Sequence, residues 1–211
     1  MAIKVLVLGA NGAIAQHVIK NLANNKEMDL TLFARRVNSL SSMTSNAEII
    51  QGDVLVKEDI EKAMEGKDIV YANLSGPMES LAKSIVESME SKGVKRLIFV
   101  TSLGIYDEIP GKFGEWNNSM IGEALKTYRR AADIIEASKL EYTVVRPSWL
   151  TNKDEVIYET TQKGEPFIGT EVSRKAVAEY ITDLIQHPGK DVKASVGVNK
   201  PGVYGDKPSF Y

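Results

Sequence analysis

Two glycines near the start of the chain have the spacing of a turn that could bind phosphate. Gly9 and Gly12 follow the apolar run at residues 3–8, and Ala15 stands at the third small position of the turn. In such turns the first glycine reverses the chain, and the second lets backbone N–H groups approach a pyrophosphate at the positive end of the next helix. The third position only requires close packing of helix against strand, so an alanine is acceptable there. The pattern predicts a dinucleotide site; the alternative is a tight turn with no ligand.

Two adjacent arginines indicate which dinucleotide this site would prefer. The segment expected to form the second strand, residues 29–34, is followed by Arg35 and Arg36. A site for NAD usually has an acidic side chain at this point, which accepts hydrogen bonds from the ribose hydroxyls. Two guanidinium groups instead favour a 2′-phosphate, because charge-assisted contacts to phosphate are strong. We therefore expect NADP as the cofactor, with NAD as the other candidate. The alternative is a solvated pair of arginines that binds nothing.

The composition argues against several other kinds of protein. The 211 residues include no cysteine and only two isolated histidines, so we expect neither disulfides nor a metal site. The net charge is −2 without a basic stripe, which argues against a nucleic-acid partner. No apolar run approaches the ~20 residues that a membrane span needs, and the first residues do not resemble a signal peptide. We expect a cytoplasmic protein with no membrane association.

The rest of the sequence alternates between strand and helix patterns. Short apolar segments rich in β-branched residues alternate with segments whose apolar residues have helical spacing. This alternation predicts an α/β fold with a doubly wound, mostly parallel, Rossmann-like sheet in a single domain over residues 1–211. Strands are expected at residues 3–8, 29–34, 47–51, 68–73, 96–102, 142–147 and 194–198. Helices are expected at residues 13–22, 57–65, 77–92 and 123–138, and a last one follows its N-cap Ser173 and ends before Pro188.

Two segments do not fit the alternation and are expected to be loops that form a pocket. Residues 103–122 and 150–171 both follow strands at the carboxyl edge of the sheet, where ligands bind in this fold. In the first, Trp116 and Phe113 could cover a ligand, or could anchor the loop to the body of the protein. The alternative for both segments is a solvated loop. The turn-rich segment 202–211 is expected to pack across the body or at a subunit contact, which leaves a monomer or a homodimer open.

Several short motifs, taken in order, resemble one family. The glycine turn and the arginine pair are followed by Gly52-Asp53-Val54, Val100-Thr101-Ser102 and Val145-Arg146-Pro147. This set resembles the atypical short-chain dehydrogenases/reductases. Within that family it is most similar to the NmrA-like, NAD(P)H-binding branch, whose members are described as NADH-flavin reductases or as epimerase-like proteins. The resemblance covers essentially the whole chain and implies these cofactor-binding residues: Gly9, Asn11, Gly12, Ala13, Ile14, Arg35, Arg36, Asp53, Val54, Asn73, Leu74, Ser75, Thr101, Arg129 and Pro147. Asp53 could equally be a capping acid for the helix that follows it.

The resemblance also implies a catalytic serine, but the rest of the usual apparatus is missing. Ser102 corresponds to the serine that such reductases combine with a tyrosine and with a lysine four residues later. That lysine lowers the pKa of the tyrosine, which then transfers a proton near neutral pH. Here Leu125 and Arg129 stand at those two positions. Arg129 could hold ribose hydroxyls or phosphate, but it cannot exchange protons at physiological pH.

No other tyrosine is expected to replace this pair. Tyr128 should point about 100° away from Arg129 on the helix. Tyr106 and Tyr158 are the other candidate acids, but each is expected to be a packing or rim residue. Reduction of a flavin or quinone needs little beyond placing hydride donor and acceptor face to face. We therefore expect an NADPH-dependent oxidoreductase whose partner is a small-molecule acceptor: a flavin, a quinone or a small carbonyl compound. The alternatives are an NADP(H)-sensing, NmrA-like regulator without catalysis and an epimerase-like enzyme.

Overall fold

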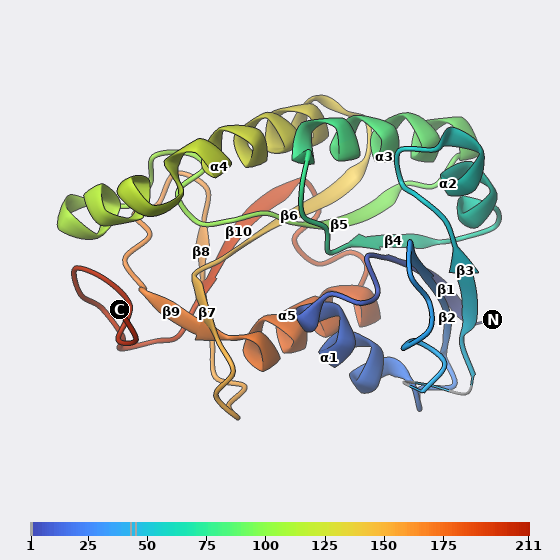
Figure 1. Ribbon diagram of the computed structural model, residues 1–211, viewed down its shortest axis with the longest axis horizontal. Coiled ribbons are helices and arrows are strands. Elements are labelled where there is room, and N and C mark those ends of the chain that lie inside the picture. Colours follow the sequence, from blue (N-terminus) through green and yellow to red (C-terminus); the bar gives the residue numbers. More distant parts are fainter. Residues whose placement is uncertain (1, 43, 45) are drawn as a thin grey trace.

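A mostly parallel sheet forms the centre of the computed structural model, which describes residues 2–42, 44 and 46–211 (Figure 1). Eight strands of the described chain follow the order β3-β2-β1-β4-β5-β6-β10-β8. Each neighbouring pair is parallel except β10 and β8, which are antiparallel. The strands of this sheet are β1 (Ile3–Leu8), β2 (Met28–Ala34), β3 (Glu48–Gln51), β4 (Ile69–Ala72), β5 (Arg96–Val100), β6 (Glu141–Pro147), β8 (Glu159–Gln162) and β10 (Ala194–Asn199).

Helices cover both faces of the sheet, as a buried parallel sheet requires. Figure 1 shows α1 (Ala13–Leu22) and α5 (Arg174–Gln186) on one face, and α2 (Lys57–Met64), α3 (Met78–Lys92) and α4 (Gly111–Ala137) on the other. The alternation of side chains along β1 explains the two layers of core. Val5 and Val7 belong to the cluster under α1 and α5, whereas Leu6 and Leu8 belong to the cluster under α2, α3 and α4. The α/β class and the Rossmann-like sheet are confirmed.

The order of the strands determines where a ligand can bind. Successive strands run outward from β1 to β3 on one side and from β4 to β6 on the other, so the direction of winding reverses between β1 and β4. At such a switch point the loops diverge and leave a crevice at the carboxyl ends of the strands. Among the described residues, no helix has both the length and the apolar character that crossing a membrane requires.

The prediction that residues 103–122 form one loop is wrong. The loop after β5 ends at Pro110, and residues 111–122 are the first turns of α4. Gly114 lies in these turns because a Cβ there would approach the Ile109 carbonyl oxygen to 2.1 Å. Glycine and asparagine disfavour helix in this stretch, but the burial of Phe113 and Asn117 holds it in place.

The segment 150–171 is also more regular than expected. β7 (Trp149–Thr151) pairs with β9 (Glu171–Ser173) in a small second sheet, and β8 adds an antiparallel edge strand to the main sheet. Only the connections between these strands are irregular. In Figure 1 this small sheet and the C-terminal segment lie at the same end of the molecule as the first turns of α4.

A buried ion pair fixes the loop between β5 and α4. Arg146 of β6 and Glu108 of the loop are both buried and form a salt bridge. The Glu108 carboxylate also accepts the backbone N–H groups of Gly104, at 3.0 Å, and Tyr106, at 2.9 Å. This one carboxylate therefore satisfies two backbone donors of the loop and the guanidinium of a strand, and so ties the loop to the sheet.

Candidate functional site

The glycine turn after β1 is packed too closely to accept other residues. Gly9 has a φ of 78°, in the left-handed region, and a Cβ there would lie 2.3 Å from the Asn73 carbonyl oxygen. A Cβ at Gly12 would lie 1.9 Å from the side-chain nitrogen of Asn73. Ala15, in contrast, is fully buried in the core under α1, where its methyl group fits. The close approach of β4 to this turn is therefore what requires the two glycines.

The first turn of α1 presents free backbone donors. Its N-cap is Gly12, which has no side chain to cap the helix, and the first turn contains no acidic residue. The first helical hydrogen bond runs from the N–H of Gln16 to the carbonyl of Gly12, at 2.9 Å. The N–H groups of Ala13 and Ile14 have no partner within the helix. The Ile14 side chain belongs to the core, so its contribution to a phosphate site would come from the backbone.

A cavity of about 280 Å³ opens beside this turn at the carboxyl ends of β1, β2, β3 and β4. Its walls include ten residues that the sequence singles out as cofactor-binding: Gly9, Asn11, Gly12, Arg35, Arg36, Asp53, Val54, Asn73, Leu74 and Ser75. These residues come from four separate segments, and the fold brings them to one place.

The two arginines at this cavity have no counter-charge. Arg35 and Arg36 are exposed, and within the described chain neither guanidinium takes part in an ion pair or a hydrogen bond. The backbone next to them is held by Asn11, whose amide nitrogen donates to the Arg36 carbonyl at 2.6 Å. Two unpaired guanidinium groups at the edge of a cavity are suited to a phosphate group.

Asp53 forms a local turn at the rim of the same cavity. Its carboxylate accepts the N–H of Leu55 at 2.9 Å, and its own N–H donates to the Asp59 carboxylate at 3.0 Å. The N-cap of α2 is Val56, so Asp53 does not cap the helix.

A second cavity, of about 500 Å³, lies after β5 and β6 at the same edge of the sheet. Thr101, Ser102 and Pro147 line it, as do Tyr128 of α4 and Arg174 of α5. The Thr101 hydroxyl donates to the Val145 carbonyl at 3.2 Å and so belongs to the sheet. The wall also contains a group of aromatic side chains, Trp149, Phe210 and Tyr211.

Tyr128 points away from Arg129, as expected, but it is Tyr128 that faces the second cavity. Ile121, Ala124 and Tyr128 form one stripe of α4 that faces the second cavity, together with Ser102. Neither the Tyr128 nor the Ser102 hydroxyl has a hydrogen-bond partner among the residues that the structure describes. The structure thus brings together a serine and a tyrosine, but the tyrosine comes from position 128 rather than from position 125, where Leu125 is buried.

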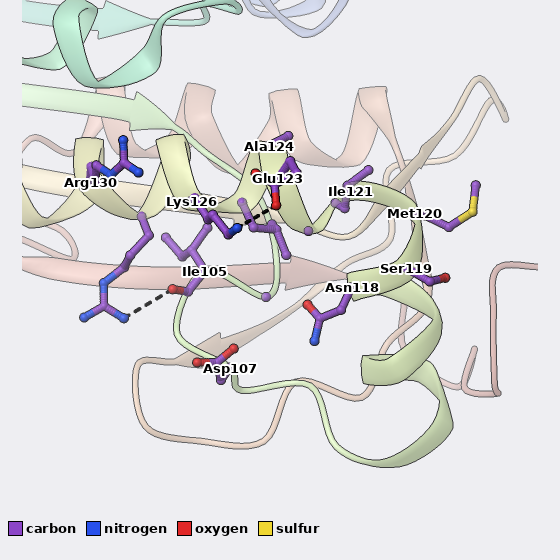
Figure 2. Close-up of a pocket in the computed structure, with 14 residues that line it drawn as sticks. Ile105, Asp107, Asn118, Ser119, Met120, Ile121, Glu123, Ala124, Lys126 and Arg130 are labelled. Carbon is purple, nitrogen blue, oxygen red and sulfur yellow. Dashed lines mark hydrogen bonds and ion pairs between the residues drawn. The ribbon is translucent and has the colours of Figure 1, made fainter.

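Arg129 does not join this group, because it lines a different cavity. That cavity, of about 780 Å³, lies between the loop after β5 and the outer face of α4, and Figure 2 shows Ile105, Asp107 and Lys126 around it. Arg129 donates to the Ile105 carbonyl at 3.3 Å and pairs with Asp133. The other cations of this cavity are paired as well: Lys126 with Glu123 and Arg130 with Glu79.

The remaining candidate tyrosines have structural contacts. The Tyr106 hydroxyl donates to Glu136 at 2.6 Å and lies 3.0 Å from the Ser195 hydroxyl; burial and Glu136 raise its pKa. Tyr158 packs edge-on against Tyr180, with ring centroids 5.7 Å apart. Among the described residues, no three His, Cys, Asp or Glu side chains gather as metal ligands would.

A model of the NAD(P)H-binding family matches residues 9–188, which is most of the chain. The chain belongs to the NAD(P)H-binding family. Its members here include proteins described as oxidoreductases and as epimerases, so the family assignment gives the cofactor class and leaves the reaction open.

Three relatives illustrate the range of this NAD(P)H-binding family. A Rossmann-fold NAD(P)-binding family protein from Shigella flexneri is 48% identical over the full length of both chains, with a TM-score of 0.87. A short-chain dehydrogenase/reductase from Veillonella parvula, solved in complex with NADP, is 29% identical over both full lengths, with a TM-score of 0.91. An uncharacterised sugar epimerase from Bacillus subtilis is 29% identical over 71% of this chain and 73% of its own.

Proposed function

We propose that this protein is an NADPH-dependent oxidoreductase that transfers hydride to a flavin, a quinone or a small carbonyl acceptor. The observation on which this rests is the pair of unpartnered hydroxyls, Ser102 and Tyr128, in an aromatic cavity. The cavity lies after β5 and β6, whereas the glycine turn lies after β1, on the same edge of one sheet. A dinucleotide held at the turn would extend along this edge toward the hydroxyls.

The preference for NADP over NAD is supported by the charge at the first cavity. Arg35 and Arg36 leave two guanidinium groups without counter-ions beside it. The 2′-phosphate of NADP is the group that would use them, whereas NAD would leave them unpaired. The relative from Veillonella parvula, which was solved with NADP, is consistent with this choice.

The residues of the second cavity would orient the acceptor and donate hydrogen bonds to it. Bound NADPH supplies a hydride. Burial raises the pKa of Tyr128, so its hydroxyl stays protonated near neutral pH and acts as a donor rather than as a base. Ser102, which lines the same cavity, offers a second donor. Two donors near one acceptor would stabilise the negative charge that develops as hydride arrives.

The test is oxidation of NADPH in the presence of FMN, a quinone or an aldehyde. We expect turnover with at least one acceptor, and we expect Tyr128→Phe and Ser102→Ala each to lower kcat by roughly tenfold or more while NADPH affinity stays unchanged. Tyr142→Phe, which alters a tyrosine of β6 outside the cavity, serves as the control. Tight NADPH binding without turnover on any acceptor would contradict the proposal.

Two specific observations favour other functions. Leu125 and Arg129 replace the usual tyrosine and lysine, which suits a protein that binds NADP(H) and signals its redox state to a partner. The Bacillus subtilis relative is described as a sugar epimerase. The same assays separate these cases, because a sensor would bind without turnover and an epimerase would act on a sugar without net oxidation of NADPH.

A further inference from the structure

We propose that the cavity beside Ser102 selects flat acceptors that also bear a negative charge, and that Arg174 recognises this charge. The inference rests on the proposed function, since it names the acceptor class of the same cavity. It depends on three features of the walls: an arginine without a counter-ion, a fixed group of aromatic rings, and a C-terminal segment that is tied down across the opening.

Arg174 is the unpaired cation of this cavity. It is the first residue of α5, is partly buried, and donates one hydrogen bond to the side-chain oxygen of Asn152 at 2.8 Å. A second, longer contact of 3.5 Å reaches the Leu150 carbonyl. Both contacts use the same terminal nitrogen, so the other guanidinium N–H groups have no partner within the described chain. No carboxylate of the described chain lies within ion-pair distance of Arg174.

Three acidic residues on the segments around Arg174 form ion pairs with lysines. Asp154 pairs with Lys175, and Glu155 pairs with Lys200. Glu171 pairs with Lys153 at 2.6 Å. Because each neighbouring carboxylate has its own lysine, none can move to Arg174 without breaking an existing pair. A partly buried guanidinium without a counter-charge is costly, and a carboxylate or phosphate on the ligand would offset that cost through charge-assisted hydrogen bonds.

The aromatic rings of the cavity wall pack against one another. Trp149 lies 4.8 Å from Trp116 and 5.2 Å from Tyr211, measured between ring centroids, and its indole N–H donates to Asn117 at 2.9 Å. Tyr211 also contacts Trp116, at 5.1 Å. Rings fixed in this way present a flat apolar surface, which favours a flat aromatic ligand at little entropic cost.

The C-terminal segment completes this wall. Ser209 donates to the buried Glu171 carboxylate twice, from its N–H at 3.0 Å and from its hydroxyl at 2.6 Å. This anchor places Phe210 and Tyr211 at the cavity, where each remains about half exposed, at 49% and 51%. Apolar rings left open to solvent beside an unpaired guanidinium form a surface for a ligand that is aromatic at one end and anionic at the other.

The larger cavity beside α4 does not have this character. Its three cations are each paired with an acid, and aromatic side chains are absent from the walls as described. The two cavities therefore differ in the chemistry of their walls: only the smaller one combines aromatic rings with an arginine that has no acidic partner in the described chain.

FMN and riboflavin test the inference, because they share one ring system and only FMN has a phosphate. Both would be titrated into the protein saturated with NADP⁺, so that the cofactor cavity is occupied. Binding is followed by quenching of the protein's two tryptophans, Trp116 and Trp149, which both belong to this aromatic group. We expect FMN to bind at least about tenfold more tightly than riboflavin, as a charge-assisted pair implies.

Substitution of Arg174 should remove that preference. In Arg174→Gln we expect FMN to bind about tenfold more weakly and riboflavin to bind as before, so that the two affinities become similar. Arg174→Lys should restore part of the preference. Lys175→Gln is the matched control, because it removes the neighbouring charge, which points to Asp154 and does not line the cavity. Circular dichroism and thermal melting verify that each variant is folded.

Three outcomes would overturn the inference. One is equal affinity for FMN and riboflavin in the unaltered protein. Another is a preference for FMN that survives in Arg174→Gln. The third is a loss of NADPH affinity in that variant with no change in the FMN preference, which would assign Arg174 to the cofactor. If the unaltered protein prefers FMN to riboflavin, and Arg174→Gln abolishes that preference, but no acceptor supports NADPH oxidation, only the proposed function is contradicted. The binding assay does not require turnover.

Discussion

The side chains that carry the proposed chemistry are those whose polar groups the fold leaves without partners. Buried and partly buried polar groups in proteins are normally hydrogen-bonded, so an exception needs a reason. At the second cavity, the partly buried Ser102, Tyr128 and Arg174 have polar groups without partners in the described chain, and at the first the exposed guanidinium groups of Arg35 and Arg36 also have none. Other buried polar atoms without a partner, such as the Tyr71 hydroxyl and the Arg96 Nε, lie away from both cavities. A bound ligand would supply the missing partners at the two cavities.

The arginine pair is expected to determine the preference for NADPH. In the double variant Arg35→Gln/Arg36→Gln, NADPH affinity should fall by roughly 10–100-fold, because two charge-assisted contacts to the 2′-phosphate are lost. NADH affinity should not change. Fluorescence titration of both nucleotides measures this, and Lys83→Gln, an exposed change on α3, controls for overall charge. An equal loss of affinity for NADPH and NADH would show that the arginines do not recognise the 2′-phosphate.

Gly12→Ala should damage both stability and cofactor binding. The new methyl group would meet the Asn73 side chain, which must move, at a cost of about 1–3 kcal/mol in the free energy of unfolding. Gly12→Ala/Asn73→Ala should regain stability without regaining NADPH affinity, since the backbone approach stays blocked. Urea unfolding and NADPH titration measure the two effects. Gly189→Ala, where a Cβ meets nothing within 4 Å, is the control; a comparable loss there would refute the steric explanation.

At the scale of elements, α4 shows why part of the site could not be predicted from the sequence. The strands and most helices follow from apolar periodicity, because each buries a face of its own. The start of α4 does not, because it depends on tertiary contacts of Phe113 and Asn117 rather than on propensity. The direction of Tyr128 depends on how this helix is rotated against β5 and β6, and residue spacing alone contains no information about that rotation.

The buried pair between the β5–α4 loop and β6 should be important for stability. Glu108→Ala leaves Arg146 buried without its counter-charge, which we expect to cost about 3–5 kcal/mol in the free energy of unfolding. Glu108→Ala/Arg146→Met should recover much of that loss. Urea unfolding at neutral pH gives both values. A cost below about 1 kcal/mol would mean that hydrogen bonds from Arg146 to Ser195 and Thr161 suffice without the carboxylate.

The anchor of the C-terminal segment should depend on pH. Burial alone would raise the pKa of Glu171, but hydrogen bonds from Lys153 and Ser209 outweigh it and hold the pKa below its ordinary value of about 4.3. Because the folded pKa is the lower one, the anchor is fully stabilising above that ordinary value and is lost as the pH falls through the folded pKa. Tryptophan fluorescence should therefore change as the pH falls below about 4.3, as Tyr211 leaves Trp116.

Glu171→Gln provides the check on this pH dependence. The variant cannot titrate at this position, so its fluorescence should already resemble the released form at neutral pH and should show no step in acid. Circular dichroism over the same range separates release of the segment from acid unfolding. An identical acid step in the variant would assign the change to another carboxyl group.

For the whole molecule, the sequence predicts the α/β class from the alternation of strand and helix patterns, and it predicts the glycine turn and the arginine pair because each is a short contiguous motif that follows a strand. The acceptor cavity was much less accessible to prediction, since its walls come from α4, β7, α5 and the C-terminal segment, which meet only after folding. Arg174 shows this well. Its position at the start of a helix gives no hint that every nearby acid is paired elsewhere.

Cofactor binding should stabilise the whole fold. At a concentration 100 times its Kd, a ligand adds about 2.7 kcal/mol to the free energy of unfolding. For a chain of this size that corresponds to an increase in Tm of roughly 5–10 °C. NADPH should give this increase and NADH a smaller one at the same concentration, as measured by differential scanning fluorimetry. Equal increases with both would contradict the assignment of the arginine pair.

The residues that line the two cavities come from two separate parts of the sequence. All residues that line the first lie between positions 9 and 81, and all that line the second lie between positions 101 and 211. Under the proposed function, mutations that alter the acceptor would lie in the second stretch and would leave the arginine pair and the glycine turn of the first stretch unchanged. A chimaera of two family members joined between residues 81 and 101 would take its first cavity from one parent and its second cavity from the other. We expect such a chimaera to have the nucleotide preference of the first parent and the acceptor preference of the second.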